Sequence, residues 1–554
     1  MYDPGTAVRA RSKEVFERAL DARDARFDGV FFVGITSTGI YCRPVCPARV
    51  SNTHNRRFFN SAAAAERAGF RPCLRCRPEL APGRAQVDAV PRLADAAARR
   101  ISAGALNGGT VRELAEDLSV SPRHLRRAMK REIGVSPVEL AQTHRLLLAK
   151  QLLADTRLSV GRIALASGFQ SVRRFNASFR ERYRMSPTDV RRSARGGSSS
   201  RTPDPAGAAT EEPAANGGAA IAGANGMPPT VPAGDLLRLT LAYRTPLDWD
   251  ALLLLLRRDA IAGVELVEGR RYGRTVRLGE CTGVVFAEDA SGTNGRSNGG
   301  SNGNSGRSNG AGRRDAGHLG LDVSVSLLPV LMPLLAGLRQ MFDLDAEPEV
   351  VDAHLRQGGL GELVDRRPGL RLPGALDGFD VAFRAVLANS ARWQAGGSSL
   401  VRRVTCALGE RFDTGVPGLD QLPPGVECVA AAGERGLIDL GVGRRRATAL
   451  AHVARRVVDG SLHLEPGSNA TAARRRLMEI DGVGDRLATT IVMRALQWPD
   501  ALPFTDPALG RAAGVPERRA LRERARAWRP WRAYAALHLW IDADAATPEP
   551  ETRR

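Results

Sequence analysis

Hydrophobic and polar positions change their spacing several times along the chain, and each change marks an expected element or boundary. Apolar residues recur at helical spacing over 90–192 and again over 373–545, whereas they alternate at Leu236–Tyr243 as in a strand. Two stretches, 193–233 and 289–316, are rich in Gly, Ala, Ser, Asn and Pro and show little periodicity. We therefore expect a disordered linker at the first stretch and a disordered insertion at the second.

Strand-like segments flank the second stretch, which predicts that it interrupts a sheet. They are Arg274–Leu278 and Gly283–Ala287 before it and Leu319–Ser326 after it. A chain of 554 residues is too long for one core, so several domains are expected. The predicted domains, with the linker between the second and the third, cover residues 1–85, 90–192, 234–372 and 373–545.

Residues 110–131 have the rhythm of a helix, a turn and a second helix. The turn Ser119-Val-Ser121 follows an apolar face, Ser121 suits an N-cap, and Pro122 suits the first helical position. The second helix, about 122–132, turns basic side chains outward. They include Arg123, Arg126 and Arg127.

A second copy of this pattern, at residues 160–187, resembles the AraC-type signature. Gly168 fits its turn, and the helix at 171–182 follows. Phe169, Phe175 and Phe179 fit the core, and Arg173 and Arg174 fit the exposed face. The resemblance implies two helix-turn-helix units joined by a helix at Pro137–Leu153, with their second helices in successive major grooves of DNA. A helical bundle with a solvated basic face remains the alternative.

The charge of the chain favours an anionic partner. The formal net charge is +20 and the isoelectric point about 10.8, which points first to nucleic acid. An arginine-rich composition without a binding role is the plain alternative. The first residues are charged and no apolar run approaches the ~20 residues of a membrane span, so we expect a cytoplasmic protein.

Four of the seven cysteines form two close pairs, Cys42 with Cys46 and Cys73 with Cys76. Pairs of this spacing are typical of a tetrahedral zinc site made of four thiolates, and cysteines in a chain without an export signal favour metal chemistry over disulfides. By itself, this spacing leaves a purely structural zinc ion as one interpretation.

The residues around the cysteines resemble the N-terminal domain of the Ada adaptive-response proteins. The resemblance rests on Ser37-Thr-Gly-Ile-Tyr-Cys-Arg-Pro-Val-Cys-Pro-Ala-Arg and Gly69-Phe-Arg-Pro-Cys-Leu-Arg-Cys. It implies that Cys42 is both a zinc ligand and the acceptor of a methyl group from a DNA methylphosphotriester. Losing one thiolate charge would then strengthen DNA binding. Candidate phosphate contacts are Arg43 and Arg71, with Arg49, Arg75 and Arg77 nearby.

The last third of the chain contains a glycine hairpin between two expected helices. Gly482-Val-Gly484 is typical of a helix-hairpin-helix, in which backbone N–H groups approach a DNA phosphate. About twenty residues later, Asp506 stands at a helix start in Leu502-Pro-Phe-Thr-Asp-Pro-Ala-Leu-Gly-Arg. This pairing resembles the helix-hairpin-helix DNA glycosylases, which implies that Asp506 is the catalytic carboxylate.

The stretch from 236 to 543 further resembles the 3-methyladenine glycosylase II (AlkA) branch. Trp528-Arg-Pro-Trp-Arg-Ala-Tyr-Ala-Ala-Leu-His-Leu-Trp fits its C-terminal helix, which implies that Trp540 stacks on a flipped base. A core tryptophan is the alternative. Cys281, Cys406 and Cys428 lie outside any methyltransferase motif and are expected to be core residues.

Three positions depart from the glycosylase pattern. No lysine follows the hairpin, where the chain reads Asp485-Arg-Leu, so a monofunctional hydrolase is expected. Arg486 stands near an expected tryptophan, and Ser390 stands where an apolar wedge usually lies. The alternative is therefore a DNA-binding regulator whose glycosylase-like half is inactive.

The predicted fold class is multidomain and mainly α, with α+β parts. It comprises a four-cysteine zinc domain, a tandem helix-turn-helix domain, an α+β domain with an antiparallel sheet and an all-α helix-hairpin-helix domain. One Zn²⁺ is the expected cofactor. Double-stranded DNA and RNA polymerase are the expected partners of a monomer that contacts no membrane.

Overall fold

The computed structural model describes residues 13–48, 51–83, 93–195, 236–289, 317–388 and 399–545. The predicted linker and insertion lie almost wholly outside these residues, as do Arg49 and Ser390. Two expected boundaries were wrong. Helix α10 (Pro187–Arg195) extends into the predicted linker, and strand β8 (Cys281–Asp289) includes the first residue of the predicted insertion. Across the described ranges, no helix combines the length and apolarity that crossing a membrane requires.

A small four-stranded sheet carries the cysteines. Its order is β3-β1-β2-β4, and β2 runs antiparallel to β1 and parallel to β4. Buried aromatic residues such as Phe31 and Tyr41 fill the space between the sheet and its helices. The elements are α2 (Lys13–Asp21), β1 (Phe32–Ile35), β2 (Ile40–Cys42), β3 (Arg56–Phe59), α3 (Ala62–Arg67) and β4 (Arg71–Pro72).

The next region is helical, and its helices begin at the expected caps. The Ser121 hydroxyl accepts a hydrogen bond from the His124 amide, and Pro122 takes the first helical position. Gly168 has a φ of +84° in the turn before α9, which favours glycine. The remaining helices are α4 (Leu93–Ser102), α5 (Val111–Asp117), α6 (Pro122–Glu132), α7 (Pro137–Asp155), α8 (Val160–Ala166) and α9 (Val172–Tyr183).

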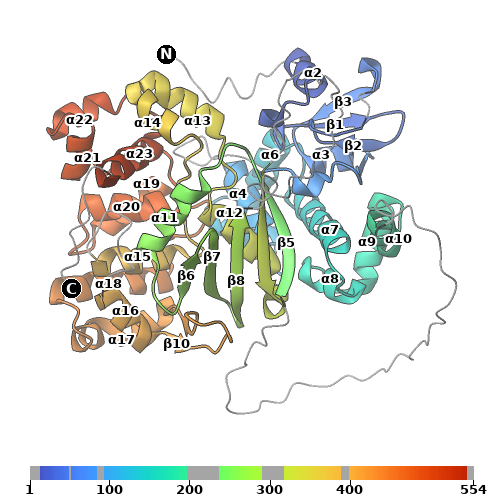
Figure 1. Cartoon of the computed structure of the whole chain (residues 1–554). Helices are drawn as coiled ribbons and strands as arrows, with labels where there is room; N and C mark the ends of the chain where they lie inside the picture. The colour runs from blue at the N-terminus through green and yellow to red at the C-terminus, as the bar shows by residue number, and fades with distance from the viewer. Residues whose placement is uncertain are drawn as a thin grey trace, which may run out of the picture.

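An antiparallel sheet with the order β5-β9-β8-β7-β6 lies at the centre of the molecule (Figure 1). As expected, β8 and β9 flank the predicted insertion, and they pair directly. Val325 and Ser326, predicted as strand, instead begin the 3-10 helix η6 (Val325–Val330). The other elements are β5 (Leu236–Tyr243), α11 (Trp249–Asp259), β6 (Glu265–Glu268), β7 (Arg271–Leu278), β9 (Gly317–Ser324) and α12 (Leu331–Met341).

Helices make up most of the C-terminal region, as the hydrophobic pattern predicted. Buried ion pairs join it to the sheet region: Arg384 contacts Glu265, and Arg494 contacts Asp259, each at 2.7 Å. The elements are α13 (Pro348–Leu355), α14 (Gly361–Arg366), α15 (Gly378–Ala388), α16 (Ser399–Leu408), β10 (Glu410–Arg411), β11 (Gln421–Leu422), α17 (Val426–Asp439), α18 (Arg444–Val458), α19 (Ala470–Met478), α20 (Asp485–Ala495), α21 (Pro507–Ala512), α22 (Arg518–Arg524) and α23 (Arg532–Ala545).

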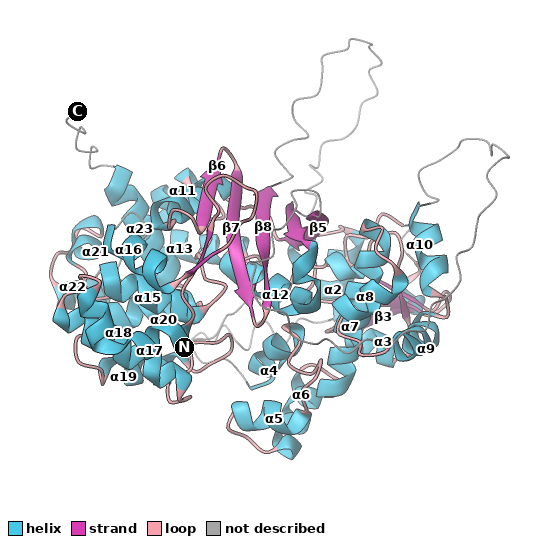
Figure 2. Ribbon diagram, turned by 90° about the horizontal axis from the view of Figure 1, so that it is seen from below, coloured by secondary structure: helices cyan, strands magenta, loops and turns pink. Residues whose placement is uncertain are grey.

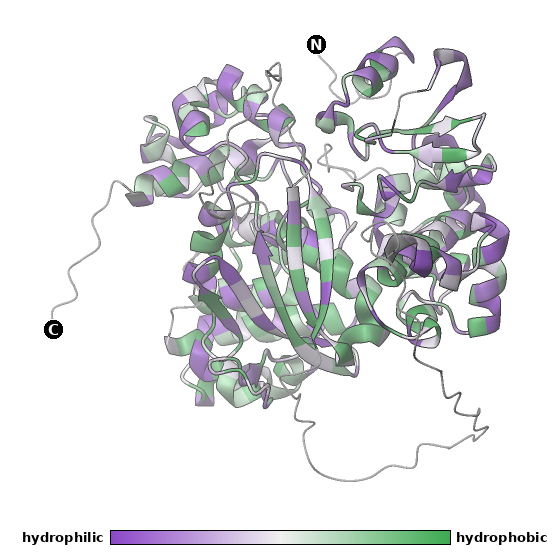
Figure 3. Ribbon diagram, turned by 45° about the vertical axis from the view of Figure 1, so that its right-hand side comes forward, coloured by the Kyte–Doolittle hydropathy of each residue, from purple (hydrophilic) through white to green (hydrophobic). Residues whose placement is uncertain are grey.

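The N-terminal and C-terminal halves pack against each other. One apolar core contains Leu152 and Phe179 from α7 and α9 together with Leu239 and Leu331 from β5 and α12. The central sheet lies between the C-terminal helices and the helices α7–α9 (Figure 2). Hydrophobic segments gather around this sheet, whereas the outer helices carry many hydrophilic positions (Figure 3).

Candidate functional sites

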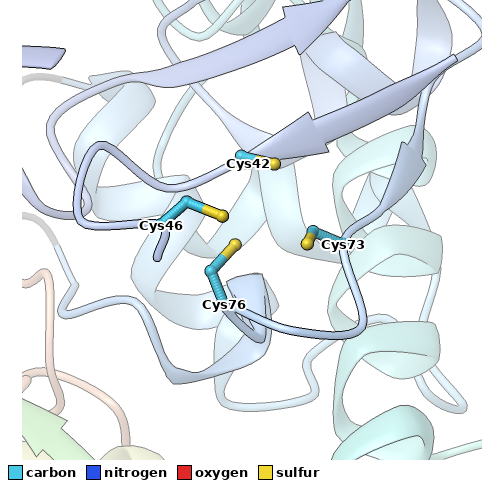
Figure 4. A group of neighbouring side chains, drawn as sticks. All are labelled: Cys42, Cys46, Cys73 and Cys76. Carbon is cyan, nitrogen blue, oxygen red and sulfur yellow. The ribbon is translucent and has the colours of Figure 1, made fainter. Parts of the chain in front are cut away.

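The four clustered cysteines come together at one end of the small sheet. Cys42 ends β2, Cys46 follows in the next loop, and Cys73 and Cys76 follow β4 (Figure 4). Their sulfur atoms all lie within 4.8 Å of one another. A tetrahedral zinc site with Zn–S bonds of about 2.3 Å places its sulfurs about 3.8 Å apart, so the cluster fits one Zn²⁺.

The four sulfurs lie close enough to shift the pKa values of one another. Hydrogen bonds from Cys42 lower the pKa of Cys46 to about 7 and the pKa of Cys73 well below its usual range, and they raise the pKa of Cys42 itself. Zinc binds thiolates, so a Zn²⁺ ion takes the place of these protons when it binds. Cys42 is partly exposed, whereas the other three cysteines are buried.

Arg43 does not lie where a phosphate contact requires it. Its side chain is only 4% exposed, and its guanidinium forms an ion pair with Asp28 and donates to the Cys76 carbonyl at 3.1 Å. The Arg43 amide also faces the Cys76 sulfur at 3.4 Å. The expectation of a DNA contact was wrong because Asp28, which buries this arginine, lies far upstream in the sequence.

The other arginines near the cluster differ in their surroundings. Arg75 is exposed and Arg71 is half-buried on β4. Arg77 forms ion pairs with Glu79 at 3.0 Å and Asp155 at 2.7 Å, so it joins the zinc unit to α7. Arg71 and Arg75 therefore keep their place as candidate phosphate contacts.

Both helix-turn-helix units present basic side chains to solvent. Leu125 and Met129 of α6 and Phe175 and Phe179 of α9 are buried against the other helices. The exposed residues on the opposite faces include all five arginines predicted for these helices. They are Arg123, Arg126 and Arg127 on α6, and Arg173 and Arg174 on α9.

The glycine hairpin joins α19 to α20. Gly482 has a φ of +90°, and a Cβ atom there would lie 2.9 Å from the Arg445 carbonyl oxygen of α18. Gly484 is the N-cap of α20, and its side-chain position faces open space. No side chain at position 484 therefore covers the first N–H groups of α20, as close approach of a phosphate would require.

Asp506 is buried and held on both carboxylate oxygens. It caps α21, where it accepts a hydrogen bond from the Ala508 amide at 3.0 Å. Its second oxygen accepts one from Nε1 of Trp540 at 2.9 Å. Trp540 is 2% exposed, so the expected stacking role does not fit its position, and the core alternative describes its burial. Sequence reasoning missed its contact with Asp506, because the two residues are far apart in the chain.

Two further expectations concern residues outside these sites. Arg486 is half-buried on α20, where the family resemblance suggested an aromatic side chain. Cys406 and Cys428 are exposed, so the expectation that they are core residues was wrong. Both belong to amphipathic helices, α16 and α17, whose burial follows from tertiary contacts.

Together, these features define a class of protein: a DNA-binding regulator with a thiolate zinc centre, joined to a helix-hairpin-helix repair domain. Known families match three separate parts of the chain. The family described as the metal binding domain of Ada matches residues 16–79, a helix-turn-helix domain matches residues 114–193, and the AlkA N-terminal domain matches residues 238–377.

Whole-chain similarity gives the family. The chain is 33% identical over 528 residues to the probable bifunctional transcriptional activator/DNA repair enzyme AlkA of Mycobacterium tuberculosis, covering 94% of this chain and 95% of that protein. It therefore belongs to the family of bifunctional transcriptional activator/DNA repair enzymes. It is also 31% identical to DNA-3-methyladenine glycosylase 2 of Escherichia coli, over 54% of this chain and 96% of that one. For the bifunctional transcriptional activator/DNA repair enzyme AdaA of Bacillus subtilis, the identity is 32%, over 31% and 80% of the two chains.

Proposed function

We propose that the chain senses DNA methylation damage at Cys42 and excises alkylated bases, such as 3-methyladenine, at Asp506. For Cys42, the supporting observation is that it is partly exposed, whereas the other three residues of the cluster are buried. For Asp506, the supporting observation is that two hydrogen bonds, one to each oxygen, fix its buried carboxylate. The family to which the chain belongs joins transcriptional activation to DNA repair, which agrees with both roles.

At the cysteine cluster, the proposed reaction is a stoichiometric methyl transfer. The Cys42 sulfur forms a bond to the methyl carbon while the bond between that carbon and a phosphate oxygen breaks. The electron pair stays on the oxygen, which restores an anionic phosphodiester. Zinc, when bound, keeps the thiols deprotonated and therefore nucleophilic.

Methyl transfer changes the charge of the cysteine cluster and therefore changes the affinity of the protein for DNA. Four thiolates around Zn²⁺ carry two net negative charges, and methylation of one sulfur leaves a single one. Repulsion between the cluster and DNA phosphates then decreases, so DNA binding strengthens. We propose that the methylated chain acts as a monomer in the cytoplasm, on nucleoid DNA, and engages RNA polymerase there through exposed helical surfaces.

At the second site, the proposed reaction is hydrolysis of an N-glycosidic bond. As the bond between C1′ and the base breaks, its electron pair leaves with the base and positive charge develops on the sugar. The Asp506 carboxylate stabilises that charge, and water adds to C1′ and loses one proton to the solvent. Asp485, Arg486 and Leu487 follow the hairpin, so no lysine amine stands there to form a Schiff base.

Base release from methylated duplex DNA tests the glycosylase role. Asp506→Asn keeps an oxygen for the α21 cap but removes the charge, so release of 3-methyladenine should fall at least about a hundredfold while the fold is retained. Asp365→Asn, at an exposed site on α14, is the matched control. No release from the wild-type chain would instead support the alternative, a regulator whose glycosylase-like half is inactive.

Transfer of labelled methyl groups from phosphotriester DNA tests the acceptor role. Mass mapping should find the label on the peptide that contains Cys42 and none on the one that contains Cys406, which is also exposed but lies outside the cluster. Zinc-loaded protein that takes up no label would show that the cluster is purely structural.

A further inference from the structure

A buried arginine from the glycosylase half reaches into the zinc unit. Arg244 directly follows β5 and is 5% exposed. Its Nη2 atom donates to the Asp28 carbonyl oxygen at 3.0 Å, and its Nη1 atom donates to the Asp345 carbonyl oxygen at 3.0 Å. One guanidinium therefore joins a loop of the zinc unit to the loop after α12.

The positive charge of the Arg244 guanidinium is held by two backbone carbonyl oxygens. Within the described ranges, Arg244 forms no ion pair, and burial lowers its pKa although the charges of Glu347, Asp345 and Asp28 oppose this shift. A desolvated cation without a paired anion is sensitive to any change in the electrostatics around it. The contact between the halves is thus placed where a nearby change of charge has a large effect.

The zinc unit connects this contact to the cysteine cluster. Asp28, whose carbonyl accepts from Arg244, holds Arg43 through its carboxylate, and Arg43 also donates to the Cys76 carbonyl. Arg43 directly follows Cys42 in the chain. A short series of buried polar contacts therefore runs from Arg43, the residue after Cys42, to the interface between the halves.

The series continues into the glycosylase half. Arg371 is fully buried and donates to the carbonyl oxygen of Arg244, and it donates to the Asp343 carbonyl oxygen at 3.3 Å. The Asp343 carboxylate accepts from the Tyr534 hydroxyl at 2.7 Å. Tyr534 lies on α23, the helix that carries Trp540 and so holds Asp506.

Other contacts fix the same interface. The Gly83 amide donates to the Asp345 carboxylate at 3.2 Å, and Gln151 of α7 donates to the Thr240 carbonyl of β5 at 2.8 Å. Beyond them lies the apolar core that both halves share. The contact at Arg244 is thus part of a continuous interface, and a change there acts on both halves.

We propose that the interface at Arg244 couples the methylation state of Cys42 to the attachment of the glycosylase half. This inference rests on the proposed acceptor role of Cys42. Methylation removes one negative charge near Arg43 and therefore alters the ion pair between Arg43 and Asp28. Through Asp28, it also alters the hydrogen bond that Arg244 donates to the Asp28 carbonyl. Because coupling free energies are reciprocal, attachment of the glycosylase half also changes the equilibrium free energy of methylating Cys42.

The test measures how tightly the halves stay together. A protease site is inserted between Gly217 and Gly218 in the zinc-loaded full chain, with Cys281, Cys406 and Cys428 replaced by Ser. Cys42 is then methylated either from phosphotriester DNA or with methyl iodide, and mass mapping confirms the modification. After cleavage, the dissociation constant of the two fragments should differ at least about fivefold between methylated and unmethylated protein.

Three variants locate the coupling. Arg244→Met keeps the apolar stem but removes both donors, so association should weaken and the response to methylation should disappear. Asp28→Asn keeps the carbonyl that Arg244 contacts but loosens Arg43, so most of the association should remain and the response should disappear. Arg238→Met, at an exposed position on β5, the strand that Arg244 follows, should behave as the unaltered chain.

Two results would overturn the proposal. One is equal association with and without a methyl group on Cys42, and the other is immediate separation of the fragments in both states. A response to methyl iodide without any transfer from phosphotriester DNA would leave the coupling intact and remove the proposed acceptor role, so the two failures are distinguishable.

Discussion

The cysteine cluster and the Asp506 site hold their reactive groups in opposite ways. Cys42 is partly exposed at the end of strand β2, and the other cysteines of the cluster lie in the turns that follow β2 and β4. Asp506 is buried at a helix start, inside an apolar cluster that includes Trp528, Leu509 and Leu537. The first site therefore depends on its metal for order, whereas the second depends on packing.

Removal of zinc should break the first site and leave the second intact. Zinc contributes an apparent ~10–16 kcal/mol in small zinc-dependent domains, so a chelator should unfold much of residues 13–83. Hydrogen exchange should show loss of protection in β1 and β2, with α20 and α23 still protected. Unchanged protection of β1 and β2 after complete zinc loss would contradict the dependence on metal.

The pH should also change the stability of the zinc and helix-turn-helix regions. Glu66 of α3 is buried against Thr143 of α7, and burial raises its pKa from 4.5 to about 7 although Arg182 opposes the shift. The folded state thus holds this proton more tightly than the unfolded state. Its contribution is fully present below pH 4.5 and is lost as pH rises to about 7, on the order of 3 kcal/mol.

Glu66→Gln should remove this dependence. Denaturant unfolding of the zinc and helix-turn-helix regions, followed between pH 5 and 7, measures it. Glu116→Gln, at an exposed position on α5, should leave the slope unchanged. A slope that persists in Glu66→Gln would assign the effect to another group.

Replacement of Trp540 tests whether its indole N–H group holds the Asp506 carboxylate in place. Trp540→Phe removes a hydrogen bond to a buried carboxylate, worth about 1.5–3 kcal/mol, so base release should fall about 10- to 100-fold. Trp528→Phe is the matched control, because its indole donates to the Gly358 carbonyl and not to Asp506. Equal losses of activity in both variants would show that packing, not Asp506, is affected.

The hairpin glycines should give the smallest effect. Gly482→Ala places a side chain at φ +90° and against the Arg445 carbonyl, which should cost about 1–3 kcal/mol of stability. Gly484→Ala has ordinary backbone geometry and open space, so the stability of the chain should change little. Thermal melting of both variants distinguishes these outcomes. Equal decreases in melting temperature would contradict the difference in backbone geometry between Gly482 and Gly484.

The two sites also differ in how far the sequence alone predicted them. Cysteine spacing and the Ser121 cap are local signals, and both led to the correct local structure. The surroundings of Arg43 and Trp540 were not predicted, because each side chain contacts a residue outside its own element, Asp28 and Asp506. The contact of Arg244 with the zinc unit had no local signal at all, since it depends on how the two halves pack.

The capping role of Asp506 has an evolutionary consequence. An acid that begins a helix is retained by selection for folding, because its replacement by alanine costs about 1 kcal/mol even when no reaction takes place. A descendant that lost excision would therefore keep this aspartate under stability selection alone. Trp540 is buried in the same apolar cluster, so selection for stability retains it as well, and retention of this pair does not by itself record selection on catalysis.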